Sequence, residues 1–255
     1  MKLIKRLFDF YINSSLHIGF AVLALTLITQ KSASLSIQIP LNGTIFFATV
    51  LGYNFLKYYE IFKTKKWHTS NYYSILTVSF LANLGFLFFF FKLNLESQIH
   101  LFLASLVVLL YPFLRKLGWL KMFLVSSVVT YVTVFIPNPT ISNDLYLELL
   151  QRFLILICLL IPFEIIDTKT DAKTLHTLPQ LFGINTTKVF GILLVIPCMI
   201  LEFLKPNPSY AILIIALITT MFIRFTTLKR NSYYTSFWVE SVPIIWWILL
   251  LIRNF

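Results

Sequence analysis

The chain has little charge, few glycines and almost no cysteine. Of its 255 residues, 12% are charged, seven are glycine and two are cysteine. So few glycines exclude a glycine-rich or low-complexity architecture. The two cysteines, Cys158 and Cys198, lie inside apolar runs, which excludes a disulfide or zinc framework and predicts small buried hydrophobes. Acidic residues are the scarcest charged class, with 10 Asp and Glu against 21 Lys and Arg.

Hydrophobic residues take the place of the missing charge. They make up 58% of the chain and the mean hydropathy is +0.82, whereas an ordinary soluble domain is roughly 45–50% apolar. Apolar runs recur along the whole chain, and no polar stretch is long enough to form a second domain. The composition therefore predicts one multi-pass membrane domain over residues 1–255.

The apolar runs have the length of membrane spans, because about 20 residues at 1.5 Å each cross roughly 30 Å of hydrocarbon. The pattern predicts an all-α integral membrane bundle of about nine transmembrane helices. Their expected ranges are residues 9–30, 39–62, 73–92, 96–114, 118–137, 146–166, 187–204, 209–228 and 234–253.

Basic residues gather at the ends of these spans. A net charge of +11 can indicate nucleic-acid binding, but Lys and Arg in such places more often set membrane orientation. With nine spans most of them fall on the side of the N-terminus. We therefore expect a cell-membrane protein with a cytoplasmic N-terminus and an outside C-terminus, with membrane lipids and no nucleic acid as partners. The first 34 residues have a signal-like profile, but a retained first helix is favoured over a cleaved signal because the remaining chain is equally hydrophobic.

Charge collects at one place in the interior of the chain, the stretch PFEIIDTKTDAKTLHTLP at residues 162–179. If the sixth helix continues through it, Glu164, Asp167 and Asp171 lie within about 60° of one another on one face. Lys169 and Lys173 lie on the opposite face. Three carboxylates on one face repel one another unless a cation lies between them or some are protonated.

Two interpretations of this acidic face remain open. Oxygen ligands without His or Cys suit a hard ion such as Mg²⁺, which binds one or two carboxylates together with the phosphates of a substrate. The plainer alternative is a solvated helix end at the level of the lipid headgroups, with Lys and Asp paired at i, i+4.

The stretch IIDTKTDAKTLHTLPQLFG resembles the second aspartate-rich motif of the UbiA superfamily of intramembrane prenyltransferases. Asp167 and Asp171 match the two aspartates, residues 177–179 match the Thr-Leu-Pro, and Gly183 matches the trailing glycine. Glu164 falls where the family often carries a further acidic or polar residue. The resemblance covers residues 150–185 at the level of motifs and the rest of the chain at the level of architecture.

The resemblance implies a nine-helix bundle that binds an isoprenyl diphosphate through Mg²⁺ at its cytoplasmic end. An isoprenyl group would pass from the diphosphate to a small lipophilic acceptor. Asp167 and Asp171 would be the catalytic and metal-binding residues, and Glu164 would help to hold the substrate.

The first motif of that family is present only in part. Asn54 matches its asparagine, but Phe55, Tyr58 and Phe62 stand where the family has three aspartates. Lys57, about 60° round the helix from Asn54, could offer positive charge to phosphate directly.

Three further basic residues are candidates for the same substrate role. They lie at the ends of the fourth and fifth expected helices and are Arg115, Lys116 and Lys121. Simple inside-positive orientation is the alternative for each of them and for Lys57.

The chain could also keep the bundle without the chemistry. The missing aspartates of the first motif favour this alternative, a non-catalytic protein that binds a lipid or a membrane partner. A transporter would need paired interrupted helices in two halves, and no such repeat is present. Glu240 lies inside the last expected span, so we expect it to face the bundle interior, paired with a neighbour such as Arg224 or in contact with substrate.

Overall fold

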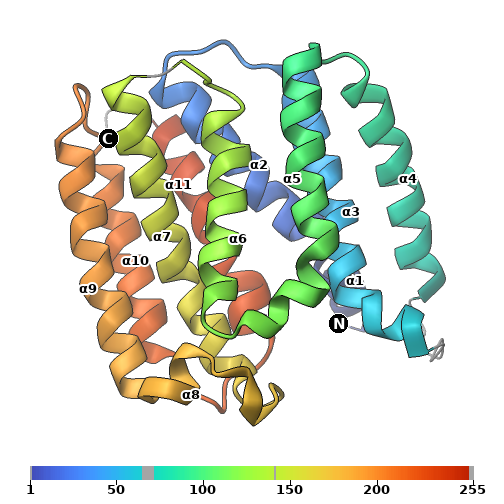
Figure 1. The fold of residues 1–255 in the computed structure, drawn as a ribbon, viewed down its shortest axis with the longest axis vertical. Coiled ribbons are helices and arrows are strands. Elements are labelled where there is room, and N and C mark those ends of the chain that lie inside the picture. The colour runs from blue at the N-terminus through green and yellow to red at the C-terminus, as the bar shows by residue number, and fades with distance from the viewer. Residues whose placement is uncertain (1, 65–71, 141, 253–255) are drawn as a thin grey trace.

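The computed structural model describes residues 2–64, 72–140 and 142–252, which form helices and no strand (Figure 1). The helices are α1 (Lys2–Asn13), α2 (Leu16–Ser32), α3 (Ile39–Thr64), α4 (Tyr72–Phe90), α5 (Leu95–Leu114), η1 (Arg115–Leu117), α6 (Leu120–Thr130), η2 (Tyr131–Phe135), α7 (Asn143–Asp167), η3 (Lys173–Leu175), α8 (Leu178–Phe182), α9 (Ile184–Phe203), α10 (Ala211–Phe225), η4 (Tyr234–Val239) and α11 (Val242–Leu251). Of these, η1 and η3 are 3₁₀-helical, and η2 and η4 are π-helical. The all-α prediction is confirmed for the described residues.

Six helices of the described chain are long and apolar enough to cross a membrane. They are Ile39–Tyr59, Tyr73–Phe90, Leu95–Leu114, Asn143–Asp167, Ile184–Phe203 and Tyr234–Leu251. α1 and α2 pass the same test only together, as a pair bent by 55°, and two shorter apolar helices cover Leu120–Phe135 and Ala211–Phe225. The architecture is a helical bundle in which several helices are able to span a membrane.

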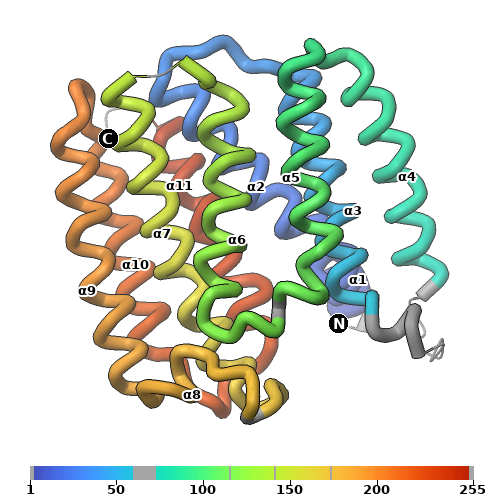
Figure 2. Tube along the Cα trace, viewed as in Figure 1, coloured from blue at the N-terminus to red at the C-terminus, as the bar shows by residue number. Residues whose placement is uncertain are grey.

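The helices differ greatly in how far they are buried. α7 is the most deeply buried of the six, whereas α4 and α5 expose most of their side chains. In Figure 2, α4 lies at one side of the bundle, and α9 and α10 lie at the other. A residue on α7 is therefore placed to meet side chains from several other helices.

Close packing fixes α7 against α9. A Cβ on Gly191 of α9 would lie 2.4 Å from Ile161 Cδ1 of α7, so a larger residue would require the Ile161 side chain to shift. Cys158 of α7 and Cys198 of α9 are both fully buried free thiols, as their apolar neighbours predict. The Sγ atom of Cys158 donates to the Gly191 carbonyl over 3.5 Å.

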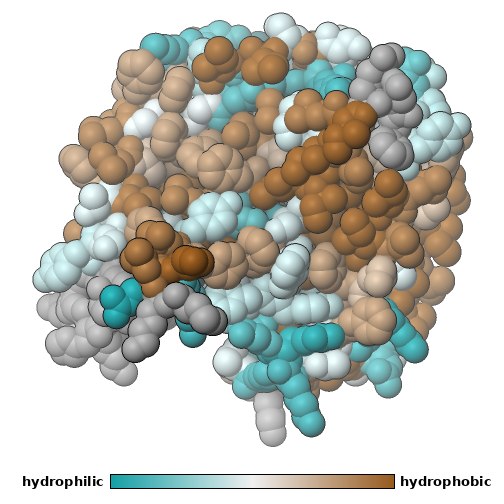
Figure 3. Space-filling model, turned by 180° about the vertical axis from the view of Figure 1, so that it is seen from behind, coloured by the Kyte–Doolittle hydropathy of each residue, from teal (hydrophilic) through white to brown (hydrophobic). Residues whose placement is uncertain are grey.

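The outer surface is also apolar. Figure 3 shows hydrophobic side chains across the middle of one face and hydrophilic side chains along its lower edge. Large residues such as Phe80, Phe88, Phe102 and Phe113 are exposed on α4 and α5. An apolar belt with a polar margin is the surface that a hydrocarbon layer requires.

The expected first span, residues 9–30, is not one straight helix. The chain breaks between α1 and α2 at Ser14 and Ser15, which are both buried. Ser15 has a φ of 62°, in the left-handed region that residues with a Cβ rarely adopt. The break depends on contacts with α3.

Candidate functional site

A buried lysine lies between two acidic residues at the end of α7. Lys121 Nζ, from α6, is 3.0 Å from Glu164 Oε1 and 3.2 Å from Asp171 Oδ2. The exposed fractions of the three side chains are 5%, 8% and 1%. The three residues, together with half-buried Asp167, form the carboxylate cluster.

The acidic face persists although α7, which ends one residue past the expected residue 166, does not continue through the motif. The helix ends at Asp167, but the amides of Thr170 and Asp171 donate to the Asp167 carbonyl over 2.9 and 2.8 Å. These bonds continue one turn beyond the helix, so Asp171 stays on the side of Glu164 and Lys121 reaches both. Asp167 interacts electrostatically with Glu164. Lys169 is exposed, and the side chain of Lys173 lies outside the described residues.

The loop after α7 is fixed by the turn before α6. Gly118 has a φ of 63°, and a Cβ there would lie 2.2 Å from the Leu175 carbonyl oxygen. The amide of Trp119 donates to the His176 carbonyl over 3.2 Å. This backbone contact brings the start of α6, and hence Lys121, to Asp171.

Replacing Gly118 by alanine should destabilise the protein more than the same change at Gly183. Both glycines have positive φ, so each substitution should cost about 1–2 kcal/mol of backbone strain. A Cβ on Gly183 meets nothing within 4 Å, whereas one on Gly118 meets a carbonyl oxygen, which should cost a further ~1–3 kcal/mol. Thermal unfolding in detergent measures the difference, and equal effects of the two substitutions would contradict the loop contact.

The cluster retains one unsatisfied atom. Glu164 Oε2 is buried and has no hydrogen-bond partner. Among the described residues no group of three His, Cys, Asp or Glu side chains comes close enough together to hold a metal.

An aromatic residue of α3 faces the carboxylate cluster. The Tyr53 hydroxyl donates to Glu240 Oε1 over 3.3 Å and interacts electrostatically with Asp167 and Tyr111. Its partners thus come from α5, α7 and the start of α11, yet Tyr53 is 38% exposed. Tyr53 therefore interacts with both Glu240 and Asp167 while its side chain stays partly exposed.

Asn54 contacts the break between α1 and α2. Its Oδ1 accepts from Ser15 Oγ over 2.7 Å, and its Nδ2 donates to Ser79 Oγ over 3.0 Å. The side chain is buried, and these bonds engage both ends of its amide. The described contacts join Asn54 to α2 and α4, not to the carboxylates of α7.

Lys57 and Tyr58 hold the other side of the same break. Lys57 Nζ donates to Asn13 Oδ1 over 3.3 Å and to the Ile12 carbonyl over 3.5 Å. The Tyr58 hydroxyl donates to the Asn13 carbonyl over 2.8 Å. The last carbonyls of a helix need such donors, so this part of α3 supports the end of α1.

The other basic candidates have different surroundings. Lys116 is exposed on η1, and the side chain of Arg115 lies outside the described residues, as does that of Phe62. Lys121, considered from sequence as a phosphate ligand, instead forms ion pairs inside the carboxylate cluster. Of these basic candidates, Lys121 is the one whose described contacts join the acidic motif.

The partner predicted for Glu240 from the sequence is wrong. The expected neighbour Arg224 is exposed, and the described hydrogen bond of Glu240 comes from Tyr53. Glu240 itself was detectable as an acid inside an apolar span. Nothing in the sequence distinguished Tyr53 from the other eleven tyrosines.

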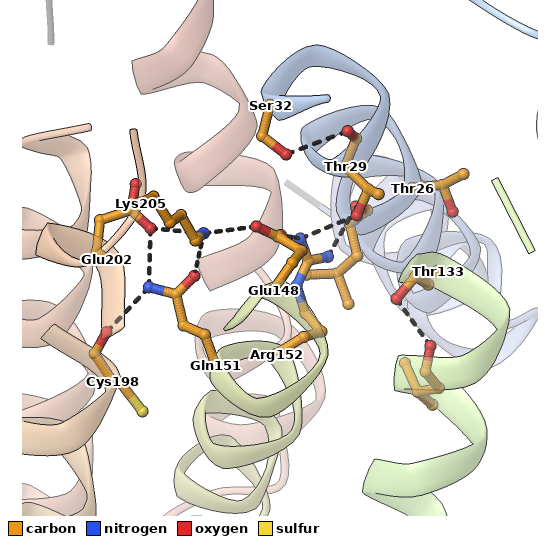
Figure 4. A network of polar contacts seen from close by, with 12 residues as sticks. Thr26, Thr29, Ser32, Thr133, Glu148, Gln151, Arg152, Cys198, Glu202 and Lys205 are labelled. Atoms are coloured by element: carbon orange, nitrogen blue, oxygen red, sulfur yellow. Dashed lines mark hydrogen bonds and ion pairs between the residues drawn. The ribbon is translucent and has the colours of Figure 1, made fainter. Parts of the chain in front are cut away.

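A second polar cluster lies in the first half of α7 and was not expected. Glu148, Gln151 and Arg152 from α7 meet Glu202 of α9 and Lys205 (Figure 4). Lys205 Nζ lies 2.8 Å from Glu202 Oε2 and also bonds Glu148, while Gln151 Nε2 donates to Glu202 Oε2 over 2.8 Å. Two positive and two negative charges balance within these five residues, the internal network.

Arg152 connects the internal network to α2. It is fully buried and donates to the Leu25 carbonyl over 2.7 Å and to Thr29 Oγ1 over 3.2 Å. Its ion pair with Glu148 Oε1 measures 2.8 Å. Because its charges neutralise one another, the internal network holds α2, α7 and α9 together rather than offering a site.

The two polar clusters are thus unlike in chemistry. The charges of the internal network balance, whereas the carboxylate cluster has three acids and one lysine. The second arrangement is the candidate site, because its excess negative charge suits a cation or a proton donor. Comparison with protein-family models, curated proteins and solved structures found no match for the chain.

Proposed function

We propose that the chain is a UbiA-like membrane prenyltransferase, which transfers an isoprenyl group from its diphosphate to a small lipophilic acceptor. The observation that carries the proposal is the convergence of Glu164, Asp167 and Asp171 at one end of a helical bundle. Tyr53 of α3 interacts electrostatically with Asp167 and donates a hydrogen bond to Glu240. The resemblance of the motif to that family supplies the substrate class.

The proposal includes nine crossings of the cell membrane, with the N-terminus cytoplasmic and the C-terminus outside. Support comes from the bent pair of α1 and α2 and from the two shorter apolar helices, which add to the six longer spans. An odd number of crossings requires chain ends on opposite sides of the membrane. A shorter helix crosses a membrane where the bilayer thins or flanking residues reach the interface.

Within this proposal the residues of the site have separate tasks. Asp167 and Glu164, one oxygen of which has no hydrogen bond, would supply oxygen ligands to a Mg²⁺ ion that enters with the diphosphate. When bound, this ion neutralises the charge of the leaving diphosphate. Lys121 fixes Glu164 and Asp171 in position, and the apolar bundle surrounds the isoprenyl chain.

A second candidate function is non-catalytic binding of a lipid or a membrane partner. It is favoured by Lys121, which already neutralises charge on two of the three acids. The contacts of Asn54, Lys57 and the break between α1 and α2 favour it too, because they give the first-motif segment a supporting role. Mg²⁺-dependent binding of a prenyl diphosphate analogue, measured by thermal shift, separates the two, since a non-catalytic relic should show none.

Replacing Asp167 or Asp171 by asparagine should lower the rate of isoprenyl transfer by at least about 100-fold. The reason is that the Asp167 change removes a charge that acts on the reacting group, an effect of roughly 10²–10³ in other enzymes. The Asp171 change breaks the ion pair with Lys121, which positions Glu164. Transfer is assayed with labelled prenyl diphosphates and purified protein. Asp144→Asn is the matched control, because Asp144 is exposed in the first turn of α7. Unchanged transfer by both variants would end the assignment.

A further inference from the structure

The segment that leads into α11 turns an acidic side chain into the bundle. The π-helical turn η4 ends at Val239, and the Glu240 amide donates to the Thr235 carbonyl five residues before it. Pro243 follows in the first turn of α11 and has no N–H to offer the Val239 carbonyl. Such wide turns occur often at functional sites.

A second contact stabilises this turn. His17 Nε2 lies 3.0 Å from the Phe237 carbonyl, and Ser241 Oγ donates to the same oxygen over 2.6 Å. His17 Nδ1 in turn lies 3.0 Å from the Tyr11 hydroxyl. The orientation of Glu240 is therefore set by residues of α1 and α2 as well as by its own helix.

Glu240 has no ion pair among the described residues. It is 9% exposed, and its one side-chain hydrogen bond comes from Tyr53. Lys57 and Tyr11 interact with it electrostatically, but the ammonium hydrogen bonds of Lys57 go to Asn13 and Ile12. A carboxylate in an apolar span with so few partners is expensive, which indicates that it has a ligand.

One residue joins Glu240 to the carboxylate cluster. The Tyr53 hydroxyl interacts with both Glu240 and Asp167, so the two acids lie near the same side chain. A diphosphate is repelled by a carboxylate that has no cation. Glu240 is therefore suited to a different part of the reaction, a group that donates a proton.

We infer that Glu240, positioned by Tyr53, binds the head group of the acceptor and takes its proton. This inference rests on the proposed prenyl transfer. It restricts the acceptor to a protic head group, which is a phenol, an alcohol or an amine. A pure hydrocarbon acceptor has no such proton for the carboxylate to bind.

The reaction balances with these groups alone. The bond between the allylic carbon and the diphosphate oxygen breaks, and its electron pair leaves with the diphosphate. A lone pair or ring carbon of the acceptor forms the new bond to the allylic carbon. The proton that the acceptor loses passes to the Glu240 carboxylate and then to water.

The experiment compares binding with turnover in the full-length protein. Binding of a non-hydrolysable geranylgeranyl diphosphonate is measured with Mg²⁺, and transfer from labelled geranylgeranyl diphosphate is measured to 4-hexylphenol, octanol and octylamine. In Glu240→Gln, binding should stay at the wild-type level while transfer falls about 10²–10⁴-fold, the usual effect of a lost general base. The acidic limb of the pH profile of transfer should disappear with the carboxylate. Glu96→Gln, exposed at the start of α5, should change nothing.

A milder variant separates an effect on transfer from an effect on folding. Tyr53→Phe removes only the hydroxyl, and transfer should fall about tenfold because one hydrogen bond to Glu240 is lost. Wild-type transfer and pH profile in both variants would overturn the inference, as would a wild-type protein that binds the diphosphonate but transfers to none of the three probes. A wild-type protein that binds no diphosphonate would instead refute the proposed function, and the inference with it.

Discussion

Replacing Lys121 by methionine should lower the free energy of unfolding by about 3–5 kcal/mol, the usual effect of removing one partner of a buried ion pair. Lys121 lies within 3.2 Å of both Glu164 and Asp171, and all three side chains are almost fully buried. Methionine has a similar volume but leaves two buried acids without a cation. Unfolding in detergent with increasing denaturant measures the change.

Two further variants make this prediction specific. Lys116→Met removes an equal charge from an exposed position at the start of the same loop and should be nearly neutral. Adding Glu164→Gln and Asp171→Asn to Lys121→Met removes the unpaired charges and should recover part of the lost stability. If Lys121→Met unfolds like the wild-type protein, or if the triple variant is less stable than the single one, the ion pairs do not hold the site.

Replacing Arg152 by methionine should have an effect of similar size, about 3–5 kcal/mol. Arg152 is fully buried and bonds the Leu25 carbonyl and Thr29 of α2 as well as Glu148 of its own helix. The substitution therefore leaves a buried carbonyl unpaired and gives the internal network a net negative charge. The same unfolding measurement applies.

The controls for Arg152 follow from its geometry. Lys31→Met removes an exposed charge in the last turn of α2 and should have little effect. Arg152→Met combined with Glu148→Gln restores neutrality, because Lys205 still pairs with Glu202, and should be more stable than the single variant. An Arg152→Met protein as stable as the wild type would show that α2 is held by apolar contacts alone.

The helical architecture was predictable because it depends on local hydropathy. Runs of about 20 apolar residues form helices wherever they occur in a bilayer. The break at Ser14 and Ser15 was not predictable in this way. It depends on Asn54 and Tyr58, which come from a helix far along the chain and satisfy the backbone and side chains at the break.

The candidate site was predictable only in its acidic half. Glu164, Asp167 and Asp171 follow helical spacing, so their shared face could be inferred from the sequence. The position of Lys121 depends on the contact between Gly118 and the loop after α7, and a contact of this kind leaves no pattern in the sequence. The hydrogen bond from Tyr53 to Glu240 likewise depends on a contact between α3 and the residues between η4 and α11.

Because Cys158 and Cys198 are completely buried, water-soluble thiol reagents should not label the folded chain. A single cysteine introduced at an exposed position would then be the one reactive thiol, with no need to remove the native pair. Ser34 and Ser232 are exposed in loops that the proposed orientation assigns to opposite sides of the membrane. Labelling intact cells with an impermeant maleimide should therefore mark Ser34→Cys and spare Ser232→Cys.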